Sequence, residues 1–383
     1  MVPAARYAAA IEIVDRIIDG GRTSVALREW GRSNRFAGSG DRRAIGDIVH
    51  DILRHWWSSA ALGGGTTGRA RVLGLLRIGG IDPDTIFNGQ GHAPAVLEGD
   101  ECVAPDVEMP TDLPPLVEGM LRERFGDQLA PLADTMRARA PLDLRVNLLK
   151  ADRSMAVASL ATEGVVVEPV PLSPMALRAP TGDRRIARSD AYLSGLVELQ
   201  DTSSQAVVDF AQPKSGERIL DYCTGAGGKA LALAALAKSP VDVHDVAPER
   251  MRDLPDRAQR AGATLRTHET AQLSGKQWDL IFADAPCSGS GSWRRDPEGK
   301  IRLTQESLDD VCTAQAQVLD NCAPMVASGG RLIYATCSLL PVENEGAVAA
   351  FLARSPQWTL LRSIALSPLD GGDGFFAAWL ERA

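Results

Sequence analysis

The sequence predicts an α/β protein with a doubly wound, mostly parallel sheet in its C-terminal half, preceded by a small helical domain and a small α+β segment. Two observations predict this fold class. After about residue 197, four short apolar runs end in small or polar residues and alternate with helical segments, the pattern of a parallel sheet with helices on both faces. In the first 77 residues, apolar residues instead recur at the spacing of amphipathic helices.

The chain divides into four parts by pattern and composition. Residues 1–78 read as a helical domain, and residues 79–115 as an acidic linker rich in Pro and Gly that lies outside any core. Residues 116–196 return to helical spacing and then to the alternating strand "LDLRVNLLK", and residues 197–383 contain the predicted sheet. Apolar residues that share a helix face are Tyr7, Ile11, Val14 and Ile18 in one segment and Ile45, Ile48, Val49, Ile52 and Trp56 in another.

The composition is that of a soluble protein. The 383 residues are 45% hydrophobic, which is enough for two or three domains. No run of about 18 apolar residues appears, and no signal-peptide pattern follows Met1. The six cysteines have neither the spacing of a disulfide framework nor that of a zinc site. We therefore expect a cytoplasmic, monomeric protein with reduced thiols, without a bound metal and without a membrane partner.

The charge is distributed unevenly along the chain. The net charge is -8, but residues 1–77 carry 12 Arg and 7 acidic residues, a net of +5, whereas residues 78–134 carry 2 Arg and 12 acidic residues, a net of -10. A basic block beside an acidic segment is compatible with local phosphate binding. Solvated helix faces remain the alternative interpretation.

A glycine-rich turn follows the first strand of the predicted sheet. The strand ends at Asp221, and the glycines of "YCTGAGGK" let the backbone pass close to a ligand and open a helix whose N-terminus attracts negative charge. The next strand ends at Asp245, 20 positions after Gly225, where a carboxylate can accept both hydroxyls of a ribose. The pair indicates an adenosine-containing cofactor without saying which one, so a nicotinamide dehydrogenase stays an alternative.

Two cysteines occupy the carboxyl ends of consecutive strands. "WDLIFADAPCSG" ends with Asp284 and Cys287, and "RLIYATCS" ends with Cys337. If these strands pair, their ends lie about 4.8 Å apart and the two thiols can face one flat ring. Cys312 and Cys322, by contrast, share an apolar helix face and are expected in a core.

Paired thiols suit the methylation of carbon 5 of a pyrimidine. Carbon 5 is a poor nucleophile, but addition of a thiolate to carbon 6 makes it enamine-like and able to take a methyl group from a sulfonium donor. Asp284 can support the developing charge by bonding or protonating the ring at N3. The carbon 5 proton must then be removed so that the enzyme thiol can leave, and a second thiol fits that step.

These motifs resemble those of the RNA cytosine-C5 methyltransferases of the Sun/Fmu (RsmB-like) family. The resemblance runs from about residue 144 to the C-terminus and rests on "LRVNLLK", "VELQDTSSQAVVDF", "DYCTGAGGK", "DAPCSGSGSWRRDP", "YATCSLLPVENE" and "DGFFAAWL". It implies a Rossmann-like class I methyltransferase domain that uses S-adenosylmethionine, with residues 116–196 as an RNA-recognition segment and residues 197–383 as the catalytic domain. In the family the cysteine after Thr is the nucleophile and the one after Pro assists release, which assigns attack to Cys337 and elimination to Cys287.

The same resemblance implies which residues surround the cofactor. Asp245 would hold its ribose and Glu269 its adenine edge, Arg250 and Asp284 are further candidates, and Lys229 is a candidate for catalysis as well. The methionine end would lie against Cys223, Thr224, Gly225, Ala226, Gly227, Gly228 and Lys229. The family usually reads A-P-G-G-K-T in this turn and Asp in place of Glu269, so this chain departs from the pattern at Gly225, Ala226, Ala230 and Glu269.

Basic residues near the motifs are candidate contacts to RNA phosphates. They are Arg145, Lys150, Arg294, Arg295, Lys300 and Arg302. For each of them, a solvated charged loop is the alternative. The N-terminal helices are similar in position to the NusB-like RNA-binding domain of the ribosomal family members, a resemblance carried by "GDRRAIGDIVHDILRH".

The sequence therefore leads to the hypothesis of an S-adenosylmethionine-dependent RNA cytosine-C5 methyltransferase that acts on ribosomal RNA, with transfer RNA as the alternative substrate. A nicotinamide-dependent oxidoreductase would give the two thiols no role. A non-catalytic RNA-binding or assembly protein that kept the fold is motivated by the altered glycine turn. Methylation of an amino nitrogen is disfavoured because that chemistry needs acceptors for the N–H groups and no thiols.

Overall fold

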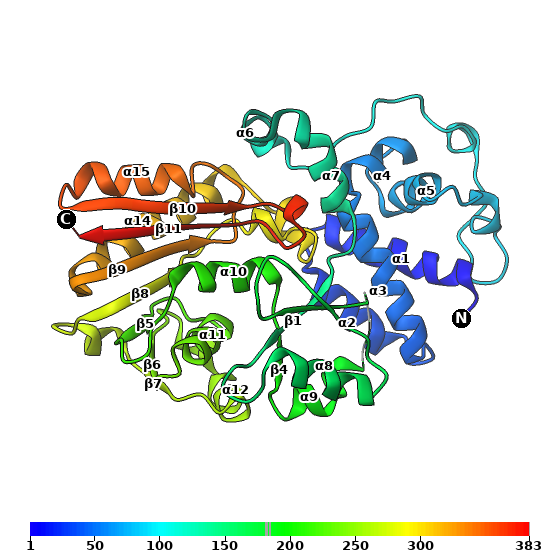
Figure 1. Ribbon diagram of the computed structural model, residues 1–383. Coiled ribbons are helices and arrows are strands. Elements are labelled where there is room, and N and C mark those ends of the chain that lie inside the picture. The colour runs from blue at the N-terminus through cyan, green and yellow to red at the C-terminus, as the bar shows by residue number, and fades with distance from the viewer. Residues whose placement is uncertain (181–182, 184, 383) are drawn as a thin grey trace. The chain divides into compact units, whose positions relative to one another are not determined.

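The computed structural model describes residues 1–180, 183 and 185–382, so Ala383 and three residues of the predicted RNA-recognition segment lie outside the described residues. The chain forms two compact units, each made of several stretches of sequence (Figure 1). The first unit comprises Met1–Glu118, Asp127–Ala138 and Asp296–Arg302. The second comprises Gly119–Gly126, Arg139–Arg295 and Leu303–Ala383.

The first unit is helical, as its apolar periodicity predicts. Its core is formed by residues such as Ile13, Val14, Ile45, Val49 and Ile52, which recur at helical spacing and are buried. Ile18 is an exception to the predicted face because it is exposed at the end of its helix. The helices are α1 (Pro3–Ile18), α2 (Thr23–Ser33), α3 (Ser39–Arg54), α4 (Trp56–Gly63), α5 (Gly68–Ile78), α7 (Leu129–Arg137) and α13 (Pro297–Ile301), with 3₁₀-helices η1 (Pro83–Thr85) and η2 (Gly99–Cys102); α6 (Pro115–Phe125) and η3 (Gly126–Gln128) lie where the chain passes between the units.

The acidic segment 79–115 is part of this unit's core, which corrects the expectation that it lies outside any core. Ile86 and Phe87 are buried among the apolar residues of the helices, and Arg69 lies over the Phe87 ring with 4.7 Å between its guanidinium carbon and the ring centre. The high content of Pro, Gly and acids describes most of the segment but hides its buried apolar pair, "IF".

The first unit also takes up the short segment that follows the first cysteine motif. The Lys300 ammonium is buried, where it donates to the carbonyl oxygens of Arg54 at 2.6 Å and Asp112 at 2.9 Å, and burial lowers its pKa to about 7. Arg302 pairs with Glu298 and donates to the Gly21 carbonyl. Both side chains were predicted to contact RNA phosphates, but their hydrogen-bonding groups are instead used within the helical unit.

The second unit contains a small antiparallel sheet in the order β2-β3-β1-β4. In its centre Leu144 lies opposite Leu177 on one side and Leu199 on the other. The chain 116–196 was predicted to be separate from the catalytic domain at residue 197, but β4 begins at that residue and pairs with β1. The elements are β1 (Leu142–Val146), α8 (Arg153–Thr162), β2 (Glu168–Pro169), β3 (Ala176–Ala179), η4 (Ile186–Arg188), α9 (Asp190–Leu193) and β4 (Val197–Leu199).

The larger sheet of the second unit has seven strands in the order β10-β11-β9-β8-β5-β6-β7, and it confirms the predicted mostly parallel sheet. The neighbours from β7 to β9 are parallel, and only β11 runs antiparallel to both of its neighbours. The strands are β5 (Ile219–Asp221), β6 (Val241–Val243), β7 (Leu265–Thr267), β8 (Trp278–Asp284), β9 (Val326–Thr336), β10 (Trp358–Leu366) and β11 (Phe375–Arg382).

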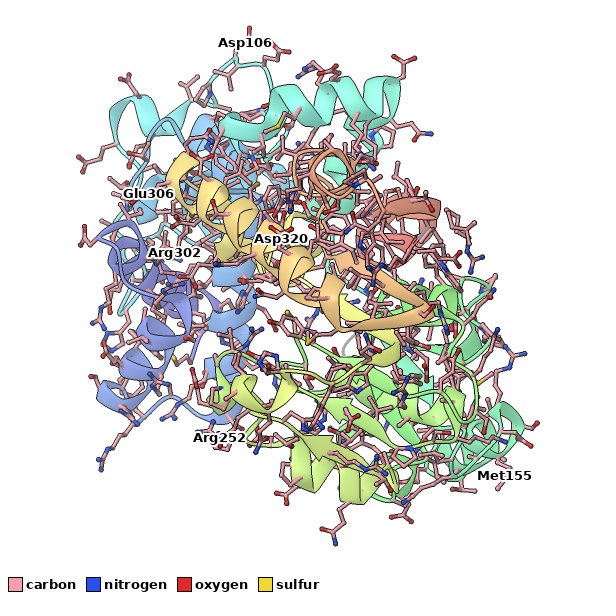
Figure 2. All side chains as sticks on the ribbon, turned by 90° about the vertical axis from the view of Figure 1, so that its left-hand side faces the viewer. Asp106, Met155, Arg252, Arg302, Glu306 and Asp320 are labelled. Carbon is pink, nitrogen blue, oxygen red and sulfur yellow. The ribbon has the colours of Figure 1, made fainter. Side chains whose placement is uncertain are left out.

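Both faces of this sheet are covered by helices, as Figure 1 shows, because alternate residues of each strand point to opposite faces. Ile219, Leu280 and Ile333 pack with α10 and α11, whereas Leu220 and Ile281 pack with α14 and α15. Figure 2 shows α14 with Glu306 and Asp320 along it. The helices are α10 (Thr202–Ala211), α11 (Gly228–Ala237), α12 (Leu254–Ala261), α14 (Gln305–Cys322) and α15 (Glu345–Arg354), with 3₁₀-helices η5 (Pro248–Met251), η6 (Thr270–Leu273), η7 (Ser290–Ser292), η8 (Ala323–Met325) and η9 (Pro368–Asp370).

The burial of Phe87 predicts that replacing it with Ala lowers the free energy of unfolding by about 3–5 kcal/mol, the usual loss for a buried aromatic ring. Chemical denaturation of the full chain measures this change. The matched control is Val103→Ala in the same acidic segment, whose side chain is 70% exposed, and it should change the free energy by less than about 0.5 kcal/mol. Equal effects of the two substitutions would contradict a core role for this segment.

Candidate active site

The two predicted cysteines come together at the carboxyl ends of β8 and β9. These strands are parallel neighbours, with Asp284 opposite Ala335, and the backbone N–H of Ala285 donates to the Ala335 carbonyl at 2.8 Å. The Sγ atoms of Cys287 and Cys337 are 3.4 Å apart, and both residues are partly exposed. Two thiols can therefore act on one bound group.

An ion pair between Lys229 and Asp284 adjoins the thiols. Lys229 stands in the first turn of α11, and its ammonium lies 2.6 Å from the Asp284 carboxylate and 5.0 Å from the centre of the Phe375 ring. Burial disfavours the Lys229 charge, but Asp284 and Cys337 favour it more strongly and hold the Lys229 pKa above its ordinary value. Lys229 is therefore a cation at neutral pH.

Cys287 is held as a neutral thiol. Its hydrogen bond with Cys337, its burial and the nearby charges of Glu343 and Asp284 all raise the pKa of Cys287 well above the ordinary value. A thiol that resists ionisation is a poor attacking nucleophile at neutral pH, since the thiolate is the reactive form.

The buried carboxylate of Glu343 ties the two cysteine motifs together. It accepts the backbone N–H of Ser288 at 2.7 Å, the Ser288 hydroxyl at 2.5 Å, the Gln315 side-chain amide at 3.1 Å and the Ser338 hydroxyl. Ser288 follows Cys287 and Ser338 follows Cys337, so one side chain fixes both loops. Glu343 was not among the predicted site residues, although it lies in the quoted "VENE"; an acid just after the second cysteine motif was the available signal.

The glycine turn adopts a conformation that needs glycine. Gly225 and Gly227 have φ values of +52° and +84°, and a Cβ atom on Gly227 would lie 2.0 Å from a methyl carbon of Leu254. The Asp245 carboxylate accepts the backbone N–H groups of Gly225 at 2.8 Å and Ala247 at 2.9 Å. In this structure Asp245, which was predicted to bind the ribose, therefore holds the glycine turn in place.

A cavity of about 530 Å³ lies between the turn and the thiols. Of the predicted site residues, those that line it are Cys223, Thr224, Gly225, Ala226, Gly228, Lys229, Arg250, Asp284, Cys287 and Cys337. Gly227, Asp245 and Glu269 do not line it; Glu269 is exposed, and its side chain caps η6. The lining residues that were not predicted are Leu199, Gln200, Ser204, Arg257, Ala285 and Pro286.

The residues of this cavity fit an S-adenosylmethionine molecule. Gly225 and Gly228 line one wall of the cavity, where the lack of a side chain leaves room beside Arg250 and Gln200. The Asp284 carboxylate faces the same space and suits the positive charge of a sulfonium group. Gly225, Gly228 and Asp284 would hold the methionine end beside the thiols.

Asp221 is a buried acid beneath the turn. Neither of its carboxylate oxygens accepts a hydrogen bond of ordinary geometry. Burial, together with the negative charge of Asp284 and against the opposing effect of Lys229, raises the pKa of Asp221 to about 8. The folded protein therefore keeps this carboxyl group protonated at neutral pH.

The arginines after the first cysteine motif are structural anchors in this structure. Arg294 is buried and donates to Asp373 at 2.9 Å and to the Gly372 carbonyl. Arg295 pairs with Asp373 at 2.6 Å and with Asp201 at 2.7 Å. Both were predicted as phosphate contacts, but their donors fasten the loop that follows Cys287 to the start of β11.

Arg145 and Lys150 are also engaged within the second unit. Arg145 is buried, burial lowers its pKa to about 10, and it donates to the Gln200 side chain and to the Gly228 carbonyl at 2.6 Å. The Lys150 ammonium, on an exposed residue, donates to two backbone carbonyls at 2.8 and 2.6 Å. Arg145 thus supports the glycine turn through its hydrogen bond to Gly228, and its predicted role as an RNA contact stays a prediction.

The topology of the seven-stranded sheet and the cavity at its strand ends define a Rossmann-like methyltransferase fold. Residues 208–380 match the family described as 16S rRNA methyltransferase RsmB/F, and residues 116–181 match the ferredoxin-like domain of the RsmF/B-like methyltransferases. The chain belongs to the RsmB/F methyltransferase family, the Sun/Fmu family that its motifs resemble.

A relative supports this assignment, and two solved structures share the fold. Ribosomal RNA small subunit methyltransferase B of Photorhabdus laumondii is 31% identical over 277 residues, which cover 68% of this chain and 64% of that protein. The crystal structure of PH0851 superposes with a TM-score of 0.79 at 23% identity and covers 100% of this chain and 99% of that one. NSun6 from Pyrococcus horikoshii, crystallised with SFG, has a TM-score of 0.63 at 18% identity and covers 70% of this chain and 98% of its own.

Two features are absent from the part of the chain that the structure describes. Within residues 1–180, 183 and 185–382, no helix combines the length and the apolar character needed to cross a bilayer. In the same part of the chain, no three His, Cys, Asp or Glu side chains are grouped so that they could hold a metal ion.

The raised pKa of Asp221 predicts a pH-dependent effect of Asp221→Asn. Between the ordinary pKa of 3.8 and the folded value of about 8, the folded protein binds one proton more than the unfolded chain, so the stability contributed by this group falls as pH rises. Asn does not titrate, so the variant should gain stability relative to the parent by up to about 1.4 kcal/mol per pH unit in this interval.

Chemical denaturation at pH 5, 6.5 and 8 measures this difference. Asp253→Asn is the matched control, because the Asp253 side chain is 79% exposed and its substitution should give the same difference at each pH. A pH-independent difference for Asp221→Asn would show that this carboxyl group titrates normally in the folded protein.

Proposed function

We propose that this protein is an S-adenosylmethionine-dependent RNA cytosine-C5 methyltransferase that acts on ribosomal RNA. The observation that carries the proposal is the 3.4 Å separation of the Cys287 and Cys337 sulfur atoms beside the Lys229–Asp284 pair. Family membership and the name of the Photorhabdus relative support methylation of small-subunit ribosomal RNA. Because the match covers 64% of that relative, the activity and the substrate are stated here as proposals.

The cofactor assignment rests on the shape of the cavity. When bound, S-adenosylmethionine supplies an electrophilic methyl group on a sulfonium. The glycine turn leaves room for its methionine end, and Asp284 offers a carboxylate to the positive charge. SFG, with which the similarly folded NSun6 was crystallised, is an analogue of this cofactor.

In the first step, Cys337 adds to carbon 6 of the cytosine. Its thiol proton passes to the Asp284 carboxylate, which transfers it to N3 as the Cys337–carbon 6 bond forms and carbon 5 becomes nucleophilic. Lys229, charged and 2.6 Å from Asp284, favours the return of that carboxyl group to its ionised form. The target base must leave its stack for both thiols to reach it.

In the release step, carbon 5 loses its proton and the Cys337–carbon 6 bond breaks. Cys287, held as a neutral thiol 3.4 Å from Cys337, donates its proton to the departing sulfur and takes up the carbon 5 proton in exchange. The N3 proton returns to Asp284 and passes to solvent, which balances the loss of the positive charge of the cofactor. In this proposed sequence of steps the two cysteines have different roles.

The altered glycine turn favours one rival, a non-catalytic RNA-binding protein that kept the fold. Gly225, Ala226 and Ala230 replace the usual family residues there. An oxidoreductase that uses a nicotinamide cofactor would share the turn but leave Cys287 and Cys337 without a role. Transfer RNA remains the alternative substrate.

The activity predicts that bisulfite sequencing of total RNA finds a 5-methylcytosine that is present with the protein and absent without it. Cys337→Ala should reduce modification of that site to the background level, because the thiol that is proposed to form the carbon 6 bond is then missing. Cys102→Ala is the matched control, since Cys102 is exposed in the helical unit and should leave modification unchanged. A modified site that persists in Cys337→Ala would refute the nucleophile assignment, and no modified site at all would favour the non-catalytic alternative.

The different roles proposed for the two cysteines predict that Cys287→Ala stays covalently bound to the RNA. Attack and methyl transfer can proceed in this variant but release cannot, so a covalent protein–RNA adduct should accumulate and migrate slowly on denaturing gels. The double variant Cys287→Ala/Cys337→Ala should form no adduct. If the adduct forms with Cys337→Ala and not with Cys287→Ala, the two roles are exchanged.

A further inference from the structure

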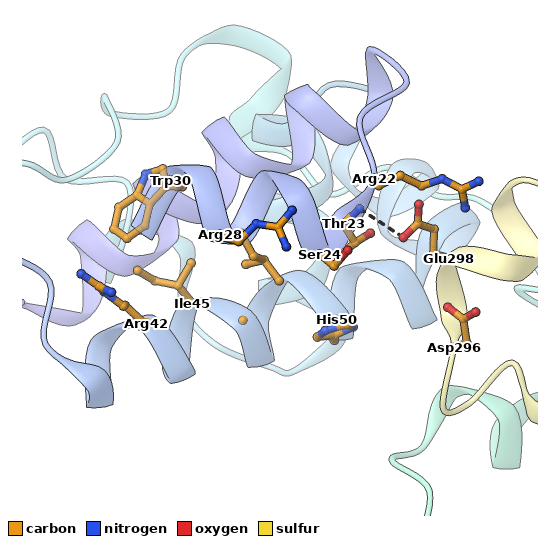
Figure 3. Close-up of a pocket in the computed structure, with 12 residues that line it drawn as sticks. Arg22, Thr23, Ser24, Arg28, Trp30, Arg42, Ile45, His50, Asp296 and Glu298 are labelled. Atoms are coloured by element: carbon orange, nitrogen blue, oxygen red, sulfur yellow. Dashed lines mark hydrogen bonds between the residues drawn. The ribbon is translucent and has the colours of Figure 1, made fainter. Parts of the chain in front are cut away.

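A groove of about 650 Å³ runs between α2 and α3 of the helical unit (Figure 3). Its floor is apolar and includes Ile45 and the buried ring of Trp30, and it stays open because position 46 is glycine. A Cβ atom on Gly46 would have no neighbour within 4 Å. The groove is larger than a single phosphate needs, so it can accept an extended ligand.

Arginines from both helices line this groove. Arg22 and Arg28 are exposed, and within the described residues no hydrogen bond or ion pair engages their guanidinium groups. Arg42, on α3, uses only its Nε to donate to a backbone carbonyl at 3.0 Å, which leaves its terminal nitrogen atoms for a ligand. Three cationic groups therefore border the same open space.

The acids at one end of the groove do not balance these arginines. Glu298 is already occupied, because it accepts the Thr23 backbone N–H at 3.1 Å and pairs with Arg302. Asp296 is the second acid, and His50 adds no positive charge because burial lowers its pKa. The ligand of such a groove is therefore an anion.

The loop that joins α2 to α3 carries an exposed aromatic ring beside the groove helices. Phe36 is 73% exposed, and Arg32, Arg35 and Arg43, which are near it in the sequence, are also exposed. Proteins bind single-stranded nucleic acid by combining cationic grooves that follow the backbone with aromatic rings on which bases stack. An acidic peptide would use the arginines but would have no need of the ring.

We propose that the groove between α2 and α3 binds a single-stranded stretch of RNA, with phosphates on Arg22, Arg28 and Arg42 and a base stacked on Phe36. The proposal rests on the proposed function, since it names a second place where that enzyme holds its substrate. Asp296 and Glu298, at one end of the groove, are reached by the chain only nine and eleven residues after Cys287. RNA in the groove therefore touches the chain segment that continues the first cysteine motif.

The test measures binding of a fluorescent oligouridylate to the full chain at several salt concentrations. Arg28→Glu and Arg42→Glu should each weaken binding several-fold and lower the slope of log K against log salt by about 0.7, the value for one phosphate contact on a single strand. Gly46→Met should weaken binding without a change of charge, because its side chain fills the groove. Phe36→Ala should weaken binding and leave the salt slope unchanged.

Two matched controls separate the groove from general electrostatics and from helix effects. Arg16→Glu changes an exposed arginine of the same unit outside the groove, and Gly40→Met changes a glycine of α3 that does not line it. Both should leave binding unchanged. The proposal is overturned if the controls lose as much affinity as the groove variants, or if polyglutamate displaces the RNA from the groove at equal charge concentration.

The binding test of the groove and the methylation test of the enzyme can fail separately. If the groove variants keep full RNA affinity while bisulfite sequencing still detects 5-methylcytosine, the groove is wrong and the enzyme assignment stands. If the groove variants lose RNA affinity while no methylation is found, the groove stands and the enzyme assignment is wrong.

Discussion

The parallel pairing of β8 with β9 is the constraint on which the candidate active site depends. The register that sets Asp284 opposite Ala335 makes both chains leave the sheet at the same edge, so residues 50 positions apart in the sequence meet at 3.4 Å. A slip of one residue would turn each side chain of a strand to the opposite face, which the buried cores on both faces prevent. The geometry of the thiols is therefore set by the apolar residues of the strands and secured by Glu343.

The protonation and pairing of the acids near the glycine turn follow from the closeness of the strand ends at this edge of the sheet. Asp221, Asp245 and Asp284 end or follow three neighbouring strands, and three charged carboxylates at one place, two of them buried, would be costly. Protonation of Asp221 leaves two charged carboxylates. Asp284 faces Lys229 at 2.6 Å, and Asp245 faces Arg250 at 3.6 Å. The turn is therefore close to neutral before any ligand arrives.

The sequence predicts the strands, the glycine turn and the two cysteines well, because each depends on a short local pattern. An apolar run that stops at small or polar residues marks the strand end at Cys287 whatever the rest of the chain does. The role of Glu343 depends on two loops 55 residues apart, and that distance hides it from a reading of either motif. The partners of Lys300 and Arg294 were hidden for the same reason, since a sequence displays a charge but not the distant carbonyl or carboxylate that receives it.

The placement of Asp296–Arg302 in the helical unit has a consequence for how the protein can be divided. The backbone passes between the two compact units five times, at Glu118, Gly126, Ala138, Arg295 and Arg302. The helical unit is therefore not formed by one continuous stretch at the N-terminus. A truncation that removes the first 138 residues deletes the two carbonyl groups to which the Lys300 ammonium donates. It also leaves the seven-residue segment Asp296–Arg302 without the unit to which it belongs. Any attempt to exchange or detach the N-terminal helices must therefore redesign residues 296–302 as well.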